Sequence, residues 1–116
     1  MRPVGALMGS GPDLASLLEE LALASPGVER RVAGELVEYS TASRPFAITN
    51  ADGRAEFLLR GDVGRAALRT SDVSASSRGP DWIALAPASV DRYARDRATA
   101  WFELARKQTA EERPPH

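Results

Sequence analysis

An amphipathic segment from Pro87 to Thr109 constrains the fold of this chain more than any other feature. When successive residues are set about 100° apart, as in an α-helix, apolar side chains gather on one side and charged side chains on the other. The apolar side consists of Val90, Tyr93, Ala94, Ala98, Trp101, Phe102, Leu104 and Ala105. A helix with such a stripe needs a second layer that covers it, and the rest of the chain must supply that layer.

The segment before this helix has the pattern of an antiparallel sheet. Apolar and polar residues alternate in short stretches separated by turn residues, which is typical of strands with one face in water. Asn50-Ala51-Asp52-Gly53 predicts a hairpin turn, and Gly34 marks a bulge within the first strand. The expected strands, of which the polar 73–77 is placed at an edge, are 28–39, 46–49, 54–59, 73–77 and 82–86.

Two shorter helices complete the predicted fold. One spans Pro12 to Ala24, where leucines recur at helical spacing, and the other runs from a capping Asp62 to Leu68. The fold class expected is therefore α+β, a two-layer domain with an antiparallel sheet of about five strands and all three helices on one face. We expect a flexible N-terminal arm at 1–11, a single domain at 12–109 and a disordered tail at 110–116.

Composition excludes several kinds of chemistry. The chain has 116 residues, 43% of them hydrophobic, which suits one globular domain. It contains no cysteine, so disulfides, thiolate nucleophiles and Cys-ligated metals are excluded. The single histidine, His116, is the last residue, which leaves no basis for a histidine triad or a two-histidine metal site. Scattered acids such as Glu35, Glu38 and Glu56 are typical of a solvated sheet face. A catalytic function and a cofactor are therefore not expected.

Charge and hydropathy limit the partners. The net charge is −1 at pH 7, and Lys107 is the only base that is not arginine. Such a chain has no long-range field to attract nucleic acid or an anionic membrane, so neither partner is expected. No apolar run approaches the ~20 residues of a membrane span, and residues 1–11 lack the pattern of a signal peptide. We expect a soluble chain in the cytoplasm.

Arg97 interrupts the apolar stripe of the last helix, with Tyr93 one turn before it and Trp101 one turn after. One interpretation is an anion site between helix and sheet, in which the guanidinium binds a carboxylate or phosphate and the two aromatic rings form its walls. The other is structural: the stem packs on the rings while the head pairs with a carboxylate of the sheet or reaches the rim. The second interpretation is the commoner one for long cationic side chains.

The sheet offers another candidate surface, because helices in a two-layer domain cover only one of its faces. Alternation predicts that Phe46, Ile48, Ala55, Phe57, Leu59, Ile83 and Leu85 face the helices. It sends outward Thr49, Glu56, Leu58, Trp82 and Ala84. An exposed Trp82 beside Leu58, with Glu56 on the same face, would form an interface, although Trp82 could equally face the core at a bulge or be covered by the arm at 1–11.

Several short motifs spread over residues 14 to 107 resemble one bacterial family. They are Leu21 to Val28, Phe46-Ala47 before the Gly53 hairpin, Glu56-Phe57-Leu58-Leu59, Trp82-Ile83-Ala84-Leu85 and Ala100-Trp101-Phe102 to Ala105. In their order the chain resembles the small luciferase-like domain and, more distantly, the MmcQ/YjbR proteins with their double-wing fold. The resemblance implies a topology, and it does not imply light emission. The balanced charge argues against the DNA binding of the MmcQ/YjbR group.

Two functional hypotheses follow from the sequence. The first is a non-catalytic binding or assembly module that uses the open sheet face around Trp82, Leu58 and Glu56 to bind a protein partner or a second copy of the chain as a homodimer. The second is a binder of a small anionic ligand or of nucleic acid, with Arg97, Tyr93 and Trp101 in the site.

Overall fold

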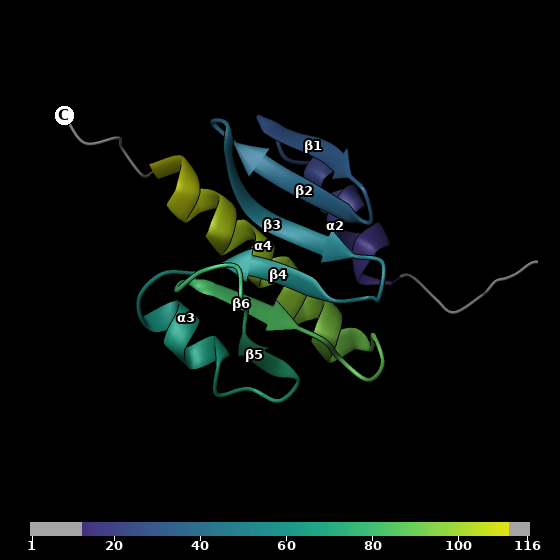
Figure 1. Ribbon diagram of the computed structural model, residues 1–116, viewed down its shortest axis with the longest axis vertical. Coiled ribbons are helices and arrows are strands. Elements are labelled where there is room, and N and C mark those ends of the chain that lie inside the picture. Colours follow the sequence, from purple (N-terminus) through teal and green to yellow (C-terminus); the bar gives the residue numbers. More distant parts are fainter. Residues whose placement is uncertain (1–12, 112–116) are drawn as a thin grey trace, which may run out of the picture.

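The computed structural model describes residues 13–111 and shows an α+β fold (Figure 1). A sheet of six strands, all antiparallel to their neighbours, has the order β1-β2-β3-β4-β6-β5. Helices α2 (Leu14–Leu23) and α4 (Arg92–Glu111) lie behind the sheet in this view and cover one of its faces. The predicted fold class is confirmed, with one strand more than expected.

The additional strand comes from the first predicted one. The stretch 28–39 was expected to be a single strand with a bulge at Gly34, and this expectation is wrong. Gly34 has a φ of +64°, a conformation that glycine adopts without strain, so the chain reverses there instead of continuing. The result is a hairpin of β1 (Val28–Ala33) and β2 (Leu36–Thr41) with only Gly34 and Glu35 between the strands.

The other strands lie where the pattern placed them. The predicted hairpin around Gly53 joins β3 (Arg44–Asn50) to β4 (Ala55–Leu58). The Trp82 strand is β6 (Trp82–Leu85), which pairs with β4 on one side. On its other side lies β5 (Val73–Ala75), at the end of the sheet, which confirms its predicted edge position.

A bulge in β3 changes which residues face the helices. Tyr39 of β2 pairs with Ala47 and Ser40 pairs with Pro45, so Phe46 has no partner of its own. Phe46 and Ala47 therefore both face the helix layer, and the alternation is reversed from there on. Ile48, expected on the helix side, lies on the open face opposite Glu56, and Thr49, expected outward, lies on the helix side opposite Ala55. The other predicted orientations in β4 and β6 are consistent with the pairing.

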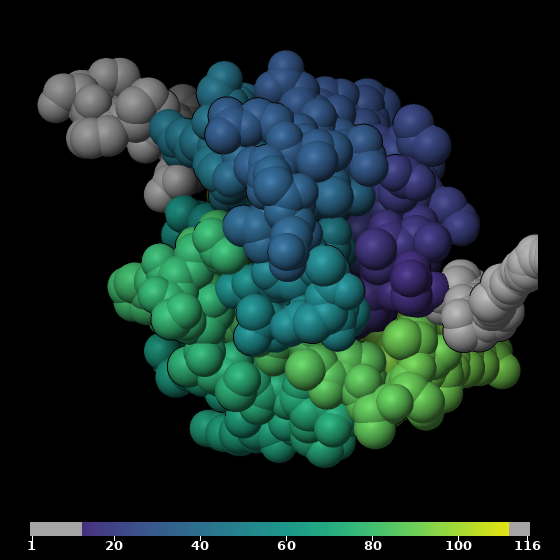
Figure 2. Space-filling view, turned by 45° about the vertical axis from the view of Figure 1, so that its right-hand side comes forward, coloured from purple at the N-terminus to yellow at the C-terminus, as the bar shows by residue number. Residues whose placement is uncertain are grey.

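The core lies between the sheet and α4. The ring of Phe102 meets the rings of Tyr39 and Phe46 edge to face, with centroids 6.1 Å and 5.1 Å away. Phe57 of β4 meets Trp101 in the same manner at 6.2 Å. Helix α2 adds buried leucines to this core, and Figure 2 shows it against the segment that contains the start of α4. The apolar stripe of the last helix thus covers the inner face of the sheet.

The helix starts differ from those predicted. Helix α4 begins at Arg92 rather than at Pro87, because the Asp91 carboxylate accepts a hydrogen bond from the Ala94 amide at 2.8 Å and caps the first turn. Helix α3 (Asp62–Ala67) is capped by Gly61, with a φ of +71°, and not by the Asp62 side chain as expected. Asp62 instead pairs with Arg65. The predicted arm at 1–11 lies outside the described residues.

Candidate binding site on the open face of the sheet

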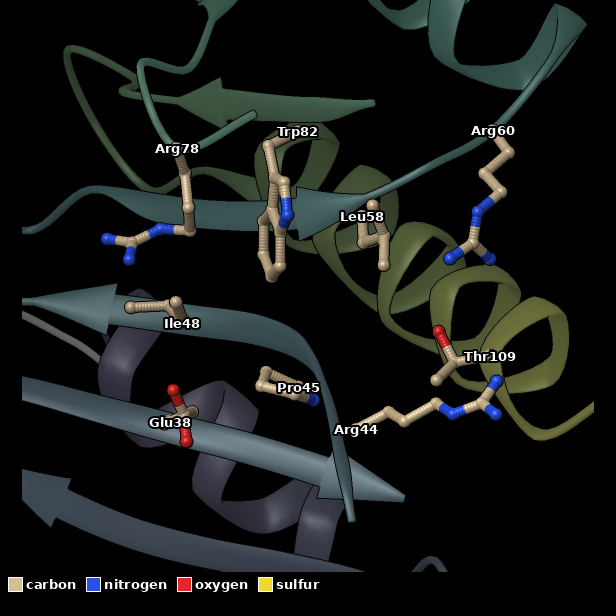
Figure 3. A pocket seen from close by; sticks show the side chains of 9 residues that line it. All are labelled: Glu38, Arg44, Pro45, Ile48, Leu58, Arg60, Arg78, Trp82 and Thr109. Atoms are coloured by element: carbon tan, nitrogen blue, oxygen red, sulfur yellow. The ribbon is translucent and has the colours of Figure 1, made fainter. Parts of the chain in front are cut away.

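The open face of the sheet has a hollow where β3 and β4 separate. The two strands pair only from Ala47 to Thr49, and before Ala47 the bulged β3 bends away from β4 (Figure 3). The last turns of α4 fill the gap from behind. There the Gln108 side chain accepts a hydrogen bond from the Arg60 amide at 2.9 Å and donates one to the Arg60 carbonyl at 3.4 Å. The Gln108 side chain thus supplies the hydrogen bonds that a neighbouring strand would otherwise give to the Arg60 backbone.

The hollow has a volume of about 400 Å³ and an apolar centre. Trp82 and Leu58 are opposite one another on neighbouring strands, and both are half-buried. Ile48 and Pro45 of β3 complete the apolar lining. Ile48 is buried although no helix covers it, because these neighbours surround it. A concave apolar surface of this size lies within the range of small-molecule sites.

Charged and polar groups surround the apolar centre. Figure 3 shows Arg44 and Arg60 at one end, approaching from β3 and from the segment after β4. Thr109 of α4 lies between them. Glu38 and Arg78 lie toward the other end. Arginines therefore border the apolar centre at both ends, with an acid beside the one at the second end.

Thr109 carries a buried hydroxyl that has no hydrogen-bond partner. The residue is 1% exposed and its Oγ1 atom is shielded from solvent. In helices a threonine hydroxyl commonly donates to the carbonyl one turn earlier, but this one does not. A buried hydroxyl without a partner costs free energy, so its presence beside the hollow requires an explanation.

Arg78 is held in position by Glu56, which lies on the same face of the sheet. The two side chains form an ion pair at 3.3 Å, and the Arg78 guanidinium also lies 5.8 Å from the ring centre of Trp82. Glu56 accepts further hydrogen bonds from Asn50, at 3.0 Å, and from the Ser76 hydroxyl. Burial raises the pKa of Glu56, but the hydrogen bonds from Ser76, Asn50 and Arg78 and the charge of Arg78 outweigh it, so the pKa lies below its ordinary value.

The structure brings together the residues of the first sequence hypothesis. Trp82, Leu58 and Glu56 share the open face, with Trp82 and Leu58 in the hollow and Glu56 buried beside it. Glu56 is only 4% exposed, because Asn50, Ser76 and Arg78 cover it. It therefore acts on the hollow through Arg78 and is not itself part of the lining.

The residues of the second hypothesis also lie together, but elsewhere. The Arg97 guanidinium lies 4.5 Å from the ring centre of Tyr93 and 5.8 Å from that of Trp101. Its NH1 group donates to the Ser71 carbonyl at 3.0 Å, which ties α4 to the segment between α3 and β5. Arg97 is not among the residues that line the hollow. The guanidinium head itself therefore lies against the aromatic rings, and it binds a loop carbonyl instead of a carboxylate of the sheet.

Sequence reasoning did not assign Arg44, Arg60 or Thr109 to a binding site. The chain has many arginines at similar spacing, so no local signal distinguishes these two. Thr109 was expected simply to end the last helix. The site depends on the β3 bulge and on the contact between α4 and Arg60, which join residues far apart in the sequence.

The remaining observations do not assign the chain to a known class of proteins. Residues 13–111 contain no cluster of acids or histidines suited to hold a metal ion. None of the helices in this part of the chain combines the length and hydropathy required to cross a membrane. A scan against protein-family models finds no match, and a search of curated proteins finds none that is similar. The class of protein must therefore be argued from the fold and the hollow.

Proposed function

We propose that this protein is a small, non-catalytic binding module that takes a ligand in the hollow on the open face of its sheet. The observation that carries the proposal is the hollow itself: about 400 Å³, apolar at its centre and bordered by arginines. It lies on the face that neither α2 nor α4 covers. Apolar sites with a few polar groups at their border are typical of small-molecule binding.

The charge state of Glu56 supports binding over catalysis. Its lowered pKa keeps the carboxylate charged at neutral pH, and a carboxylate with a low pKa is a poor general base. Its oxygens already accept hydrogen bonds from three side chains. Its role is therefore to fix Arg78 beside Trp82.

The shape of the face favours a small ligand over a second copy of the chain. In a twofold dimer the same surface meets itself, so a dimer centred on Trp82 would place one hollow opposite another. Two concave surfaces leave their apolar residues uncovered, whereas a ligand that enters the hollow covers them. Native mass spectrometry distinguishes a homodimer through this face from a bound small molecule.

The alternative site at Arg97 has weaker support. Its Nε atom is buried without a hydrogen-bond partner among the described residues, but Arg97 does not line the hollow. A ligand there would compete with the Ser71 carbonyl for the NH1 group, and the ring of Tyr93 beside it is 61% exposed. A substitution of Arg97 therefore tests the role of that group in binding.

Native mass spectrometry of the protein purified gently from the cells that make it tests the proposal. We expect the parent chain to carry a non-covalent small-molecule mass that Trp82→Arg loses. Val32→Arg is the matched control, because Val32 is 59% exposed on β1 and does not line the hollow. Leu58→Gln serves as a second variant, and circular dichroism verifies that each variant folds.

Three results would contradict the proposal. They are a bound mass that survives both Trp82→Arg and Leu58→Gln, a bound mass that Val32→Arg removes equally, and parent chains that are bare monomers. A bare dimer that Trp82→Arg dissociates would identify a second copy as the occupant in place of a ligand.

A further inference from the structure

We infer that a second copy of this chain pairs with the edge strand β1, so that two sheets join into one through an antiparallel contact between two β1 strands. The second copy lies beside the sheet and not over it, so the hollow on the open face stays accessible in both copies. Three observations carry the inference: the exposed edge of β1, the direction of its backbone groups, and a charge pattern that is complementary to itself.

The two edges of the sheet differ in length. At one edge β5 has three residues, whereas at the other β1 has six, of which five are exposed. Figure 1 shows β1 at the rim of the sheet, with no described helix or strand beyond it. Proline, a bulge or a lysine commonly protects an edge from association, and β1 has none of these. An edge of this length can therefore add a further strand.

The backbone groups of alternate residues in β1 point away from β2. In an antiparallel pair, positions that are hydrogen-bonded to the partner alternate with positions whose N–H and C=O groups point outward. The two-residue turn makes Ala33 a hydrogen-bonded position, so the groups of Val32 and Arg30 point outward. The Val28 amide agrees with this alternation, because it donates to the Ser25 carbonyl at 3.3 Å. Arg30 and Val32 thus present donors and acceptors to a neighbouring strand.

The charges of β1 select one register for a twofold contact, in which one residue lies opposite its own copy. A contact centred on Arg30 places Glu29 opposite Arg31 of the second copy, and this pair occurs twice. A contact centred on Glu29 or on Arg31 places like charges opposite one another, which is destabilising. A centre on Val28 or Val32 leaves fewer residues of the strand paired. The register centred on Arg30 is therefore the one that the charges favour.

The open face of the sheet fits the same register. Arg31 lies opposite Glu38 of β2. In the dimer it lies between Glu38 of its own chain and Glu29 of the second copy, so the signs alternate along the row. Opposite charges on neighbouring strands stabilise a sheet.

The helix side of β1 also accommodates a second copy. Arg30 is opposite the buried Tyr39, so its side chain lies on this side, where it meets its own copy. An inward charge can protect an edge from association, but here Glu19 of α2 binds Arg30 at 2.9 Å and offsets its charge. Val32, which is 59% exposed, lies opposite Val28 of the second copy and is covered by it.

Sedimentation velocity of the full chain tests the inference by charge reversal. We expect the parent to dimerise at concentrations up to about 100 μM. Glu29→Arg and Arg31→Glu should each weaken the dimer at least about tenfold, because each makes two attractive pairs repulsive. An equal mixture of the two variants should restore a dimer, since each substituted position then meets an opposite charge. Asp96→Arg is the matched control for Glu29→Arg, because it makes the same change of charge at an exposed position of α4. Circular dichroism verifies that each variant folds.

Hydrogen exchange of the parent chain, followed by nuclear magnetic resonance, tests the register without a substitution. The amides of Arg30 and Val32 should exchange more slowly at high protein concentration than at low concentration, because only the dimer gives them a partner strand. The amides of Glu29 and Arg31, which point toward β2, should change little.

Several results would overturn the inference. They are a parent that stays monomeric at the highest concentration, a dimer that both charge reversals leave intact, a mixture of the two variants that stays monomeric, and exchange at Arg30 and Val32 that is independent of concentration. A dimer that Trp82→Arg dissociates would place the second copy on the open face and would overturn it as well. Val32→Arg should weaken the dimer and keep the bound small-molecule mass, so this inference and the proposed function fail separately.

Discussion

Replacement of Glu56 by glutamine probes how firmly the border of the hollow is built. The glutamine keeps the shape of the side chain and one acceptor oxygen, so Ser76 can still donate to it. It loses the charge that pairs with Arg78, and its new amide group faces Asn50 and Arg78, which are donors. The change therefore removes the electrostatic part of the cluster and leaves the packing intact.

The expected cost is about 2 kcal/mol at pH 7. Breaking a fully buried ion pair costs about 3–5 kcal/mol, but here the Arg78 side chain is 33% exposed while that of Glu56 is 6% exposed, so water relieves part of the loss. For a domain of this size 2 kcal/mol corresponds to a fall in Tm of roughly 8–16 °C. Glu103→Gln is the matched control, because the Glu103 carboxylate that pairs with Arg106 on α4 is 41% exposed, against 6% for Glu56, and its loss should change stability by less than about 0.5 kcal/mol.

The effect should depend on pH in a defined direction. Because the pKa of Glu56 is lowered in the folded state, its charge stabilises the fold above the ordinary pKa range of glutamate. That contribution is lost as the pH falls through the folded pKa. Urea unfolding of parent and variant should therefore show the largest difference at pH 7 and a shrinking one below about pH 4. A difference under about 0.5 kcal/mol at pH 7, or one independent of pH, would refute this reasoning.

Two further substitutions test the packing around the site. Arg97→Met should lower the free energy of unfolding by about 1 kcal/mol, since it removes the hydrogen bond to Ser71 and the contacts with Tyr93 and Trp101, and it should keep the bound small-molecule mass in native mass spectrometry. Loss of that mass in this variant would instead support the site at Arg97. Gly64→Ala should destabilise the fold by about 2 kcal/mol in urea unfolding, despite the higher helix propensity of alanine, because its Cβ would lie 2.3 Å from the Leu59 carbonyl oxygen. A Gly64→Ala variant as stable as the parent would show that α3 is not held against the end of β4.

The sequence predicted the fold well because its signals are local. The stripe on the last helix, the Gly53 turn and the alternation of β4 and β6 each depend on neighbouring residues, and each corresponds to an element of the structure. Gly34 was correctly identified as a special position, but a left-handed glycine can form either a bulge or a turn, and alternation alone does not distinguish the two.

The site was predicted less completely, because it depends on a register shift and on distant contacts. The bulge at Phe46 places Ile48 in the hollow, and no pattern in β3 indicates that shift. The hollow opens beside Arg60, where β3 no longer pairs with the chain and the end of α4 contacts it instead. That contact is a hydrogen bond between residues 60 and 108, which are far apart in the sequence. The sequence therefore identified Trp82 and Leu58 by alternation but not the arginines and the threonine that surround them.

Nuclear magnetic resonance of the ¹⁵N-labelled chain, titrated with the small molecule that co-purifies with it, tests the central claim most directly. The account predicts that the Trp82 indole signal and the backbone amides of Leu58, Arg60 and Thr109 shift together along one saturable curve. Signals around Ser71 and Tyr93, beside Arg97, should remain unchanged. Shifts confined to Ser71 and Tyr93, or no saturable shift at Trp82, would contradict the claim that the open face binds the ligand.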